Sequence, residues 1–243
     1  MGVHLPADPV RFEHQRTPSG TIRTLTRLTP HDAAAYAALV AKVTLPVEAR
    51  LRAGVLANRA TRGPAAIDPW CERRSTWRRS IRRALAARRP PTVLVADVQD
   101  FYPSVRPAVV ARALRGARVD VWTSGAIERF LLELRDRGVR GLPVGPTPSC
   151  VLANAVLADA DDALAGAGID PLRWVDDVVA FAESPRAAAR AFDAWRRQLE
   201  AVGLRAHPVK SVILVDRDEA RARLLRSRPS DAEGPARGII AWP

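Results

Sequence analysis

Three aspartates lie in segments that are otherwise apolar. Asp97 ends the run Val-Leu-Val-Ala-Asp, and Asp176 and Asp177 form a doublet within residues 173–181. Burying an ionised carboxylate costs several kcal/mol unless a partner compensates its charge. Acids that converge on one point therefore favour a divalent cation, and two Mg²⁺ ions about 4 Å apart are the usual device for nucleotidyl transfer. Because Mg²⁺ prefers a few carboxylates plus substrate phosphates, we expect these three acids to hold it, with Mn²⁺ able to replace it.

The charge of the chain suits a polyanionic partner. Its 243 residues include 38 Lys+Arg and 26 Asp+Glu, which gives a net charge of +12 at pH 7. A positive charge of this size supplies the salt-sensitive, sequence-independent part of nucleic-acid binding. Cationic surfaces also bind acidic proteins and membranes, and a preference for Arg over Lys can reflect a GC-rich genome. The charge alone therefore does not choose the partner.

The length and the cysteine content limit the class of protein. A chain of 243 residues can bury a real core and hold one or two subdomains. The two cysteines, Cys71 and Cys150, are too few for a disulfide framework or a zinc site, which favours a reducing compartment. We find neither a signal peptide nor a run of about 18 apolar residues. We therefore expect a cytoplasmic protein with no membrane partner.

Alternating helices and short strands are predicted to position the acids. Apolar runs at 92–98, 172–175 and 178–182 are typical of buried strands, and the last two form a hairpin that turns at the Asp doublet. Thr29-Pro30 is typical of a helix start after a strand at 21–28. Helices are expected at 30–43, 46–58, 70–89, 107–115, 124–137, 149–164 and 185–202, and a last strand at 212–215. The prediction is an α+β fold whose small antiparallel sheet carries the acids and packs helices on its other face.

The same segments, in the same order, resemble the reverse transcriptases over about residues 16–215. Residues 97–102, Asp-Val-Gln-Asp-Phe-Tyr, resemble the first palm motif, and Trp174-Val175-Asp176-Asp177 resembles the aromatic-x-Asp-Asp hairpin. Residues 141–154 are similar to the loop and helix under the template and the incoming base. Residues 203–210 are similar to the motif whose lysine lies near the pyrophosphate. Arg16, Gly20 and Arg23 resemble the fingers segment that grips the triphosphate.

The resemblance implies a right-hand polymerase. It places a fingers region at 1–90, a palm at 91–216 and a short tail or vestigial thumb at 217–243. The implied activity is RNA-directed DNA synthesis from deoxynucleotides and a primer on a nucleic-acid template. A partner protein or a second copy of the chain would then supply the function of the missing thumb.

Roles for individual residues follow from the motifs and from side-chain chemistry. Asp97 and Asp176 would bind both metal ions, and Asp177 is ranked as the weaker ligand because adjacent strand residues point to opposite faces. A lysine can give up a proton where an arginine cannot, so Lys210 suits a general acid toward pyrophosphate. Tyr102 would exclude a 2′-hydroxyl by its bulk. The remaining expected contacts to substrate are Arg16, Arg23, Val144, Gly145 and Ser149, and those to nucleic acid are Arg73, Arg74, Arg78, Arg82 and Trp174.

Departures from the familiar family pattern leave alternatives open. Val144 stands where familiar members have Gln, Trp174 stands where they have Tyr, and few residues follow the last predicted strand. These three traits together are more similar to the bacterial reverse transcriptases of phage-defence and abortive-infection systems. Such a protein could synthesise DNA without a template or from a protein primer, here Tyr36, a serine or a threonine. A palm-like nucleic-acid binder without catalysis is the third hypothesis.

Other residues that could carry chemistry have a structural interpretation. Asp159, Asp161 and Asp162 are expected to form a solvated helix end without a functional role. Trp70 and Trp77, at helical spacing, are expected to belong to the core rather than to a base-stacking surface.

Overall fold

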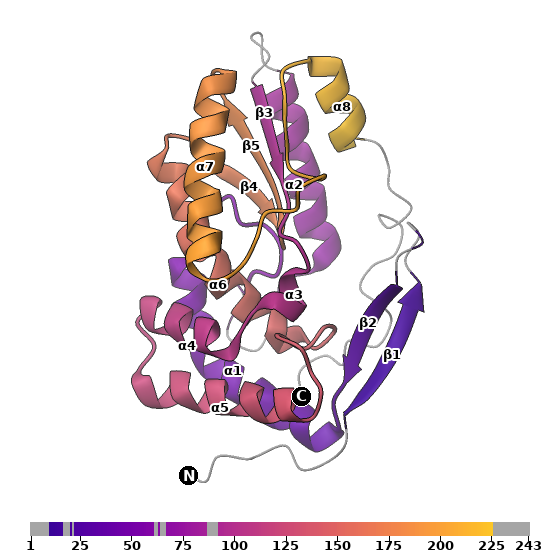
Figure 1. The fold of residues 1–243 in the computed structure, drawn as a ribbon, viewed down its shortest axis with the longest axis vertical. Helices are drawn as coiled ribbons and strands as arrows, with labels where there is room; N and C mark the ends of the chain where they lie inside the picture. The colour runs from indigo at the N-terminus through magenta and orange to yellow at the C-terminus, as the bar shows by residue number, and fades with distance from the viewer. Residues whose placement is uncertain are drawn as a thin grey trace.

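The structure is a computed structural model that describes residues 10–16, 20, 22–60, 63, 67–86 and 92–225. A four-stranded antiparallel sheet in the order β4-β5-β3-β6 occupies its centre (Figure 1). The strands are β3 (Thr92–Ala96), β4 (Pro171–Trp174), β5 (Asp177–Ala182) and β6 (Val212–Leu214). The predicted strands and the hairpin of β4 and β5 are confirmed, as is the mixed fold with its small antiparallel sheet.

Helices cover both faces of this sheet, whereas the sequence led us to expect them on one. Leu94 and Val178 belong to the main core, on the face covered by α6 (Thr147–Gly166) and α7 (Pro185–Ala201). The alternate residues Val93 and Val179 pack in a second core with α2 (Trp70–Leu85) and α8 (Arg217–Leu225). Because successive residues of these strands are all apolar, both faces must be buried.

A group of helices lies at one end of the sheet (Figure 1). It comprises α1 (Pro30–Arg50), α3 (Phe101–Ser104), α4 (Pro107–Gly116) and α5 (Val121–Asp136). The predicted start of α1 is confirmed, since the Thr29 hydroxyl accepts a hydrogen bond from the backbone N–H of Asp32 at 3.1 Å. The predicted second helix at 46–58 is wrong: α1 continues through Pro46, and Val43 and Val47 are buried on either side of it.

The chain after α1 forms an extended strip beside the sheet. Val55 makes a parallel bridge to Arg173 in β4. Backbone hydrogen bonds join Arg173 N–H to Gly54 O (2.9 Å) and Leu56 N–H to Arg173 O (3.0 Å). This strip therefore adds a short edge to β4, which the sequence pattern did not predict.

The N-terminal region contains a two-stranded ribbon of β1 (Arg11–Arg16) and β2 (Ile22–Arg27). The ribbon lies to the side of the helices (Figure 1), and all its side chains except Leu25 and Thr26 are exposed. β2 was predicted and β1 was not, because its residues do not alternate between polar and apolar.

Two further expectations concern α2 and the C-terminal region. The expected end of α2 at 89 lies outside the described residues, and in the region expected to be a short tail or vestigial thumb, residues 217–225 form the helix α8. No helix in the described ranges is long and apolar enough to cross a bilayer.

Candidate active site

The sheet brings the three aspartates to one of its ends. Asp97 directly follows β3, Asp176 lies in the two-residue turn between β4 and β5, and Asp177 begins β5. The pairing of Ala96 with Val178 fixes the register that sets these two strand ends side by side. We refer to Asp97, Asp176 and Asp177 as the acid cluster.

The electrostatics of the acid cluster are those of crowded carboxylates. Asp97 is 6% exposed. Burial, together with the neighbouring carboxylates of Asp177 and Asp97, raises the pKa of Asp176 to about 7. Although the nearby Lys210 lowers this pKa, Asp176 therefore holds a proton for part of the time near neutral pH.

Lys210 supplies one positive charge to this cluster. Its Nζ lies 3.1 and 3.2 Å from the two carboxylate oxygens of Asp97. The segment that carries Lys210 is held alongside Asp97, because the N–H of His207 donates to the Asp97 carbonyl (2.7 Å) and Val98 bridges Ala206. The structure thus brings Lys210 to the same site as the acids, as the sequence led us to expect.

The donor set of the acid cluster fits a divalent cation. No three His, Cys, Asp or Glu side chains in the described ranges form a ready-made metal site. Mg²⁺, however, takes oxygen ligands and completes its shell with substrate phosphates rather than with a protein cage. Carboxylates that raise one another's affinity for protons offer the negative charge that such a cation needs, so Asp97 and Asp176 are suitable ligands.

The turn that carries Asp176 is strained. Val175 adopts φ = 57°, in the left-handed region. A β-branched residue rarely adopts this conformation, and the cost is about 1–3 kcal/mol. Such strain persists only where the surroundings hold the backbone in place, and it is frequent at functional sites.

Tyr102, on α3, lies between the acid cluster and the loop 141–145. Burial raises the pKa of its hydroxyl well above the usual value, and Cys150 and Asp176 contribute to the rise. The hydroxyl donates to Cys150 Sγ at 3.6 Å, and the Tyr102 carbonyl accepts from the N–H of Leu142 at 2.8 Å. Gly141, at φ = 65°, permits this close approach of the loop.

The loop also contacts the N-terminal ribbon. The carbonyl of Val144 accepts a hydrogen bond from the N–H of Thr26 in β2 (2.8 Å), and Gly145 lies against the same strand. Arg23 pairs with Gln15 and Arg16 pairs with Ile22, so the two arginines lie on opposite faces of the ribbon. The two arginines that were expected at the triphosphate therefore point away from each other.

Ser149 and Tyr36 are buried together. The Tyr36 hydroxyl lies 3.0 Å from Ser149 Oγ, and both residues are 0% exposed. Burial raises the pKa of Tyr36. The structure therefore corrects two expectations: Ser149 does not present its hydroxyl to a substrate, and Tyr36 does not present its hydroxyl as a primer.

Trp174 faces the protein interior rather than a nucleic-acid surface. The Arg74 guanidinium lies 4.9 Å from its ring centroid and 4.4 Å from that of Trp77, and Trp70 meets Trp174 edge-on. Arg74 and Trp174 are thus engaged with each other, which corrects their expected contact with nucleic acid. The expected core role of Trp77 is confirmed, since this side chain is buried, and Trp70 packs against the same cluster.

The other arginines of α2 divide into two groups. Arg73 forms an ion pair with the buried Asp68, so it too serves the fold rather than an open surface. Arg78 is half-buried, whereas Arg79, Arg82 and Arg83 are exposed. Of the four α2 arginines that were expected to contact nucleic acid, Arg82 is therefore the one whose side chain is exposed.

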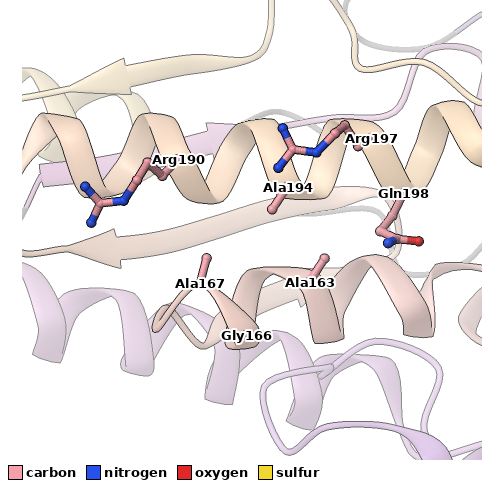
Figure 2. A pocket seen from close by; sticks show the side chains of 7 residues that line it. All are labelled: Ala163, Gly166, Ala167, Arg190, Ala194, Arg197 and Gln198. Atoms are coloured by element: carbon pink, nitrogen blue, oxygen red, sulfur yellow. The ribbon is translucent and has the colours of Figure 1, made fainter.

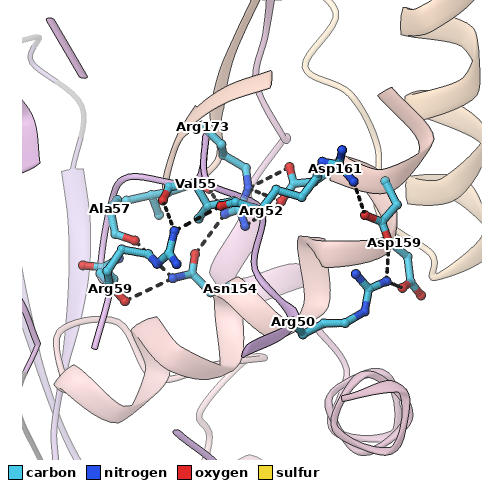
Figure 3. Close-up of polar contacts among 12 residues, drawn as sticks. Arg50, Arg52, Val55, Ala57, Arg59, Asn154, Asp159, Asp161 and Arg173 are labelled. Atoms are coloured by element: carbon cyan, nitrogen blue, oxygen red, sulfur yellow. Dashed lines mark hydrogen bonds and ion pairs between the residues drawn. The ribbon is translucent and has the colours of Figure 1, made fainter. Parts of the chain in front are cut away.

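Asp161 is a buried acid that sequence reasoning placed in solvent. It is 1% exposed, and Arg173 Nε lies 2.9 Å from each of its carboxylate oxygens. Burial raises the pKa of Asp161, and Arg173 opposes that rise. One signal was available: Asp161 follows Asn154 by seven residues on the apolar helix, so the two share a face. Asp159 is exposed and Asp162 is half-buried. Figure 3 shows the ion pair of Asp159 with Arg50.

A surface groove of about 370 Å³ lies between α6 and α7 (Figure 2). Its lining residues are Ala163, Gly166, Ala167, Arg190, Ala194, Arg197 and Gln198. None of the acid cluster contributes to it, so it is separate from the candidate active site.

Comparison with known proteins identifies a family for most of the chain. A family model described as reverse transcriptase (RNA-dependent DNA polymerase) matches residues 17–226. No curated protein sequence gives a significant match.

Proposed function

Because the chain belongs to the reverse transcriptase family, we propose that it extends a primer 3′-hydroxyl with deoxynucleotides, using an RNA template and Mg²⁺. The observation that carries this proposal is the convergence of Asp97, Asp176 and Asp177 beside Tyr102 at one end of the sheet. Placing three acids together, with Asp97 buried and Asp176 and Asp177 half-buried, is costly unless they serve a cation. That cost disfavours a nucleic-acid binder without catalysis.

The acid cluster would hold the cation through Asp97 and Asp176, with Asp177 as the weaker third ligand. When bound, two Mg²⁺ ions lower the pKa of the primer hydroxyl and neutralise the leaving pyrophosphate. Asp176 follows the strained Val175 in the turn, close enough to Asp97 and Asp177 for their charges to raise its pKa.

Lys210 would assist the departure of pyrophosphate. In the free protein its ammonium group compensates Asp97. Its side chain is 58% exposed and flexible enough to move from the carboxylate toward a phosphate. At that position it would donate a proton to the departing pyrophosphate, a role that arginine cannot fill.

The template and primer would contact exposed basic residues. Arg82, with Arg79 and Arg83 on α2, supplies charge in an open position for this contact, and the exposed Arg16 and Arg23 of the ribbon supply charge for the triphosphate of the incoming nucleotide. Forked guanidinium donors bind phosphate oxygens well. Val144 and Gly145, in the loop beside Tyr102, contact β2 of the ribbon. The incoming nucleotide would therefore lie between the ribbon and Tyr102.

The Tyr102→Ala variant is expected to admit ribonucleotides, because removal of the ring opens space for a 2′-hydroxyl. The kcat/KM ratio for dNTP over rNTP should fall by about 10²-fold. Tyr102→Phe is the matched control: it removes the contact with Cys150 but keeps the ring, so discrimination should persist. Equal discrimination in wild type and Tyr102→Ala would remove the assignment of the sugar gate.

An incorporation assay tests the proposed chemistry. Purified protein with a labelled primer on RNA, dNTPs and Mg²⁺ should elongate the primer, and EDTA or Asp97→Asn should stop it. A wild-type protein that binds the primer-template without elongating it under Mg²⁺ or Mn²⁺ would support the binder instead. Products that form without template would favour untemplated synthesis, the mode that a role in phage defence would suit, with a primer other than the buried Tyr36.

A further inference from the structure

Arg173 is a fully buried arginine three residues before Asp176. It is 0% exposed, and its guanidinium contacts three different groups, of which Asn154 and Asp161 are labelled in Figure 3. Nε lies 2.9 Å from both carboxylate oxygens of Asp161, and Nη1 donates to Asn154 Oδ1 (3.0 Å) and to the carbonyl of Val175 (2.8 Å). The first two partners are on α6, and the third is in the turn that carries Asp176.

Stability alone does not explain this arrangement. A buried ion pair is often no better for stability than apolar residues of similar volume, because both charges lose their water. Arg50 and Arg52 already join the chain to α6 through partly exposed ion pairs with Asp162. An apolar replacement could supply neither the hydrogen bond to Asn154 nor that to the Val175 carbonyl, and the second of these reaches the turn of Asp176.

That hydrogen bond acts at the strained residue. Val175 has φ = 57°, and a valine returns to a relaxed conformation unless its backbone is held. The guanidinium holds the carbonyl of Val175, and the next residue is Asp176. Any rotation of the Val175 peptide would therefore move the Asp176 carboxylate relative to Asp97.

The position of Arg173 is itself fixed from two directions. Its backbone pairs with Gly54 and Leu56 in the strip that follows α1. Asn154, which accepts from Nη1, donates through Nδ2 to the carbonyls of Ala57 and Asn58 at 3.1 Å each. The guanidinium therefore has a rigid base from which to hold the turn.

We propose that Arg173 is a positioning residue for catalysis, which holds the strained Val175 turn and thereby sets the geometry of Asp176 for cation binding. This inference rests on the proposed function of the acid cluster. The partners Asp161 and Asn154 would act through Arg173 and not through any contact with substrate.

The test compares Arg173→Lys with wild type. Lysine keeps a positive charge for Asp161 but lacks the fork that also reaches Val175. We expect kcat to fall about 10–100-fold, as for residues that orient metal ligands, with the KM for dNTP nearly unchanged. Mn²⁺ affinity, followed without nucleotide by the loss of the free-ion electron paramagnetic resonance signal, should fall at least several-fold.

A rescue variant separates positioning from a purely structural role. Glycine adopts positive φ without strain, so Arg173→Lys/Val175→Gly should recover part of the lost kcat and Mn²⁺ affinity. The control is Arg50→Lys, which perturbs ion pairs with Asp159 and Asp162 on α6 but not the turn, and it should behave as wild type. If Arg173→Lys does not fold, the volume-matched Asp161→Leu/Arg173→Met pair carries the same expectation of reduced kcat and Mn²⁺ affinity.

The outcomes distinguish this inference from the proposed function. Wild type that neither elongates primers nor binds Mn²⁺ would overturn the proposed function. Active wild type with an equally active, equally Mn²⁺-binding Arg173 variant would overturn the positioning role alone. Loss of activity without any rescue by Val175→Gly would also contradict it, since the loss would then not act through the turn.

Discussion

The Asp176→Asn variant is expected to lose primer extension by about 10³-fold or more and yet to unfold at a higher temperature than wild type at pH 8. The loss follows from removing a cation ligand at the reacting centre. The gain follows because folding forces the Asp176 carboxylate into a site where its pKa is raised to about 7. Above pH 7 the folded protein must ionise this acid at a cost on the order of 4 kcal/mol, which asparagine avoids.

The sign of this effect with pH is fixed by linkage. Between the ordinary Asp pKa of 3.8 and the raised value of about 7, the folded state binds more protons than the unfolded state. Wild type should therefore lose stability as pH rises through this range, and the advantage of Asp176→Asn should shrink toward zero near pH 4. Thermal unfolding of both proteins in EDTA from pH 4 to 8 measures this difference in stability.

At high concentration, Mg²⁺ should make wild type more stable than Asp176→Asn, since a ligand that binds the folded state stabilises it and the variant lacks one of the ligands to the cation. The matched control is Asp159→Asn, which removes an exposed acid from α6 and should change neither activity nor this pH profile. An Asp176→Asn protein that is destabilised at pH 8 in EDTA would show that Asp176 is not crowded by Asp177 and Asp97.

The Gly141→Ala variant is expected to destabilise the fold by about 3–5 kcal/mol and to disable the site. A Cβ at this position would lie 2.7 Å from the Pro103 carbonyl oxygen and closer still to that of Tyr102. The backbone at φ = 65° is also unfavourable for alanine. The loop would have to withdraw from Tyr102, so both the sugar gate and the contact with β2 would shift. Urea unfolding measures the change.

Gly168→Ala is the control for backbone strain alone. Gly168 has φ = 82° but nothing within 4 Å of an added Cβ. This variant should cost about 1 kcal/mol and leave activity intact. Equal destabilisation by both substitutions would show that the close approach of Gly141 to Tyr102 does not matter.

The sequence was most informative where pattern and chemistry coincide. The runs that end at Asp97 and surround Asp176 predicted strands, a hairpin and a common site, because acids at the ends of buried strands are costly unless they share a cation. Lys210, which the motif order placed near the pyrophosphate, lies against Asp97, a contact that the sequence did not predict. The capped start of α1 was also readable, because capping is a local interaction.

The sequence was least informative where long-range partners decide burial. The helix face that Asp161 shares with Asn154 is the one local sign that separates it from the exposed Asp159, and it does not reveal the burial, which depends on Arg173 arriving from β4. The same holds for Arg74 and Trp174, which look available in sequence but face each other across α2 and the sheet. Pro46 suggested a helix break, and packing of its neighbours in the core overrides that local preference.

The most direct measurement of the central claim is the sequence of the extended product. A labelled primer would be annealed to an RNA of mixed sequence, to DNA of the same sequence, or left without template, each with dNTPs and Mg²⁺. If synthesis is RNA-directed, the DNA product is complementary to the RNA, and it is absent with Asp176→Asn and absent without template. Products from wild type whose sequence is the same with and without RNA would contradict RNA-directed synthesis.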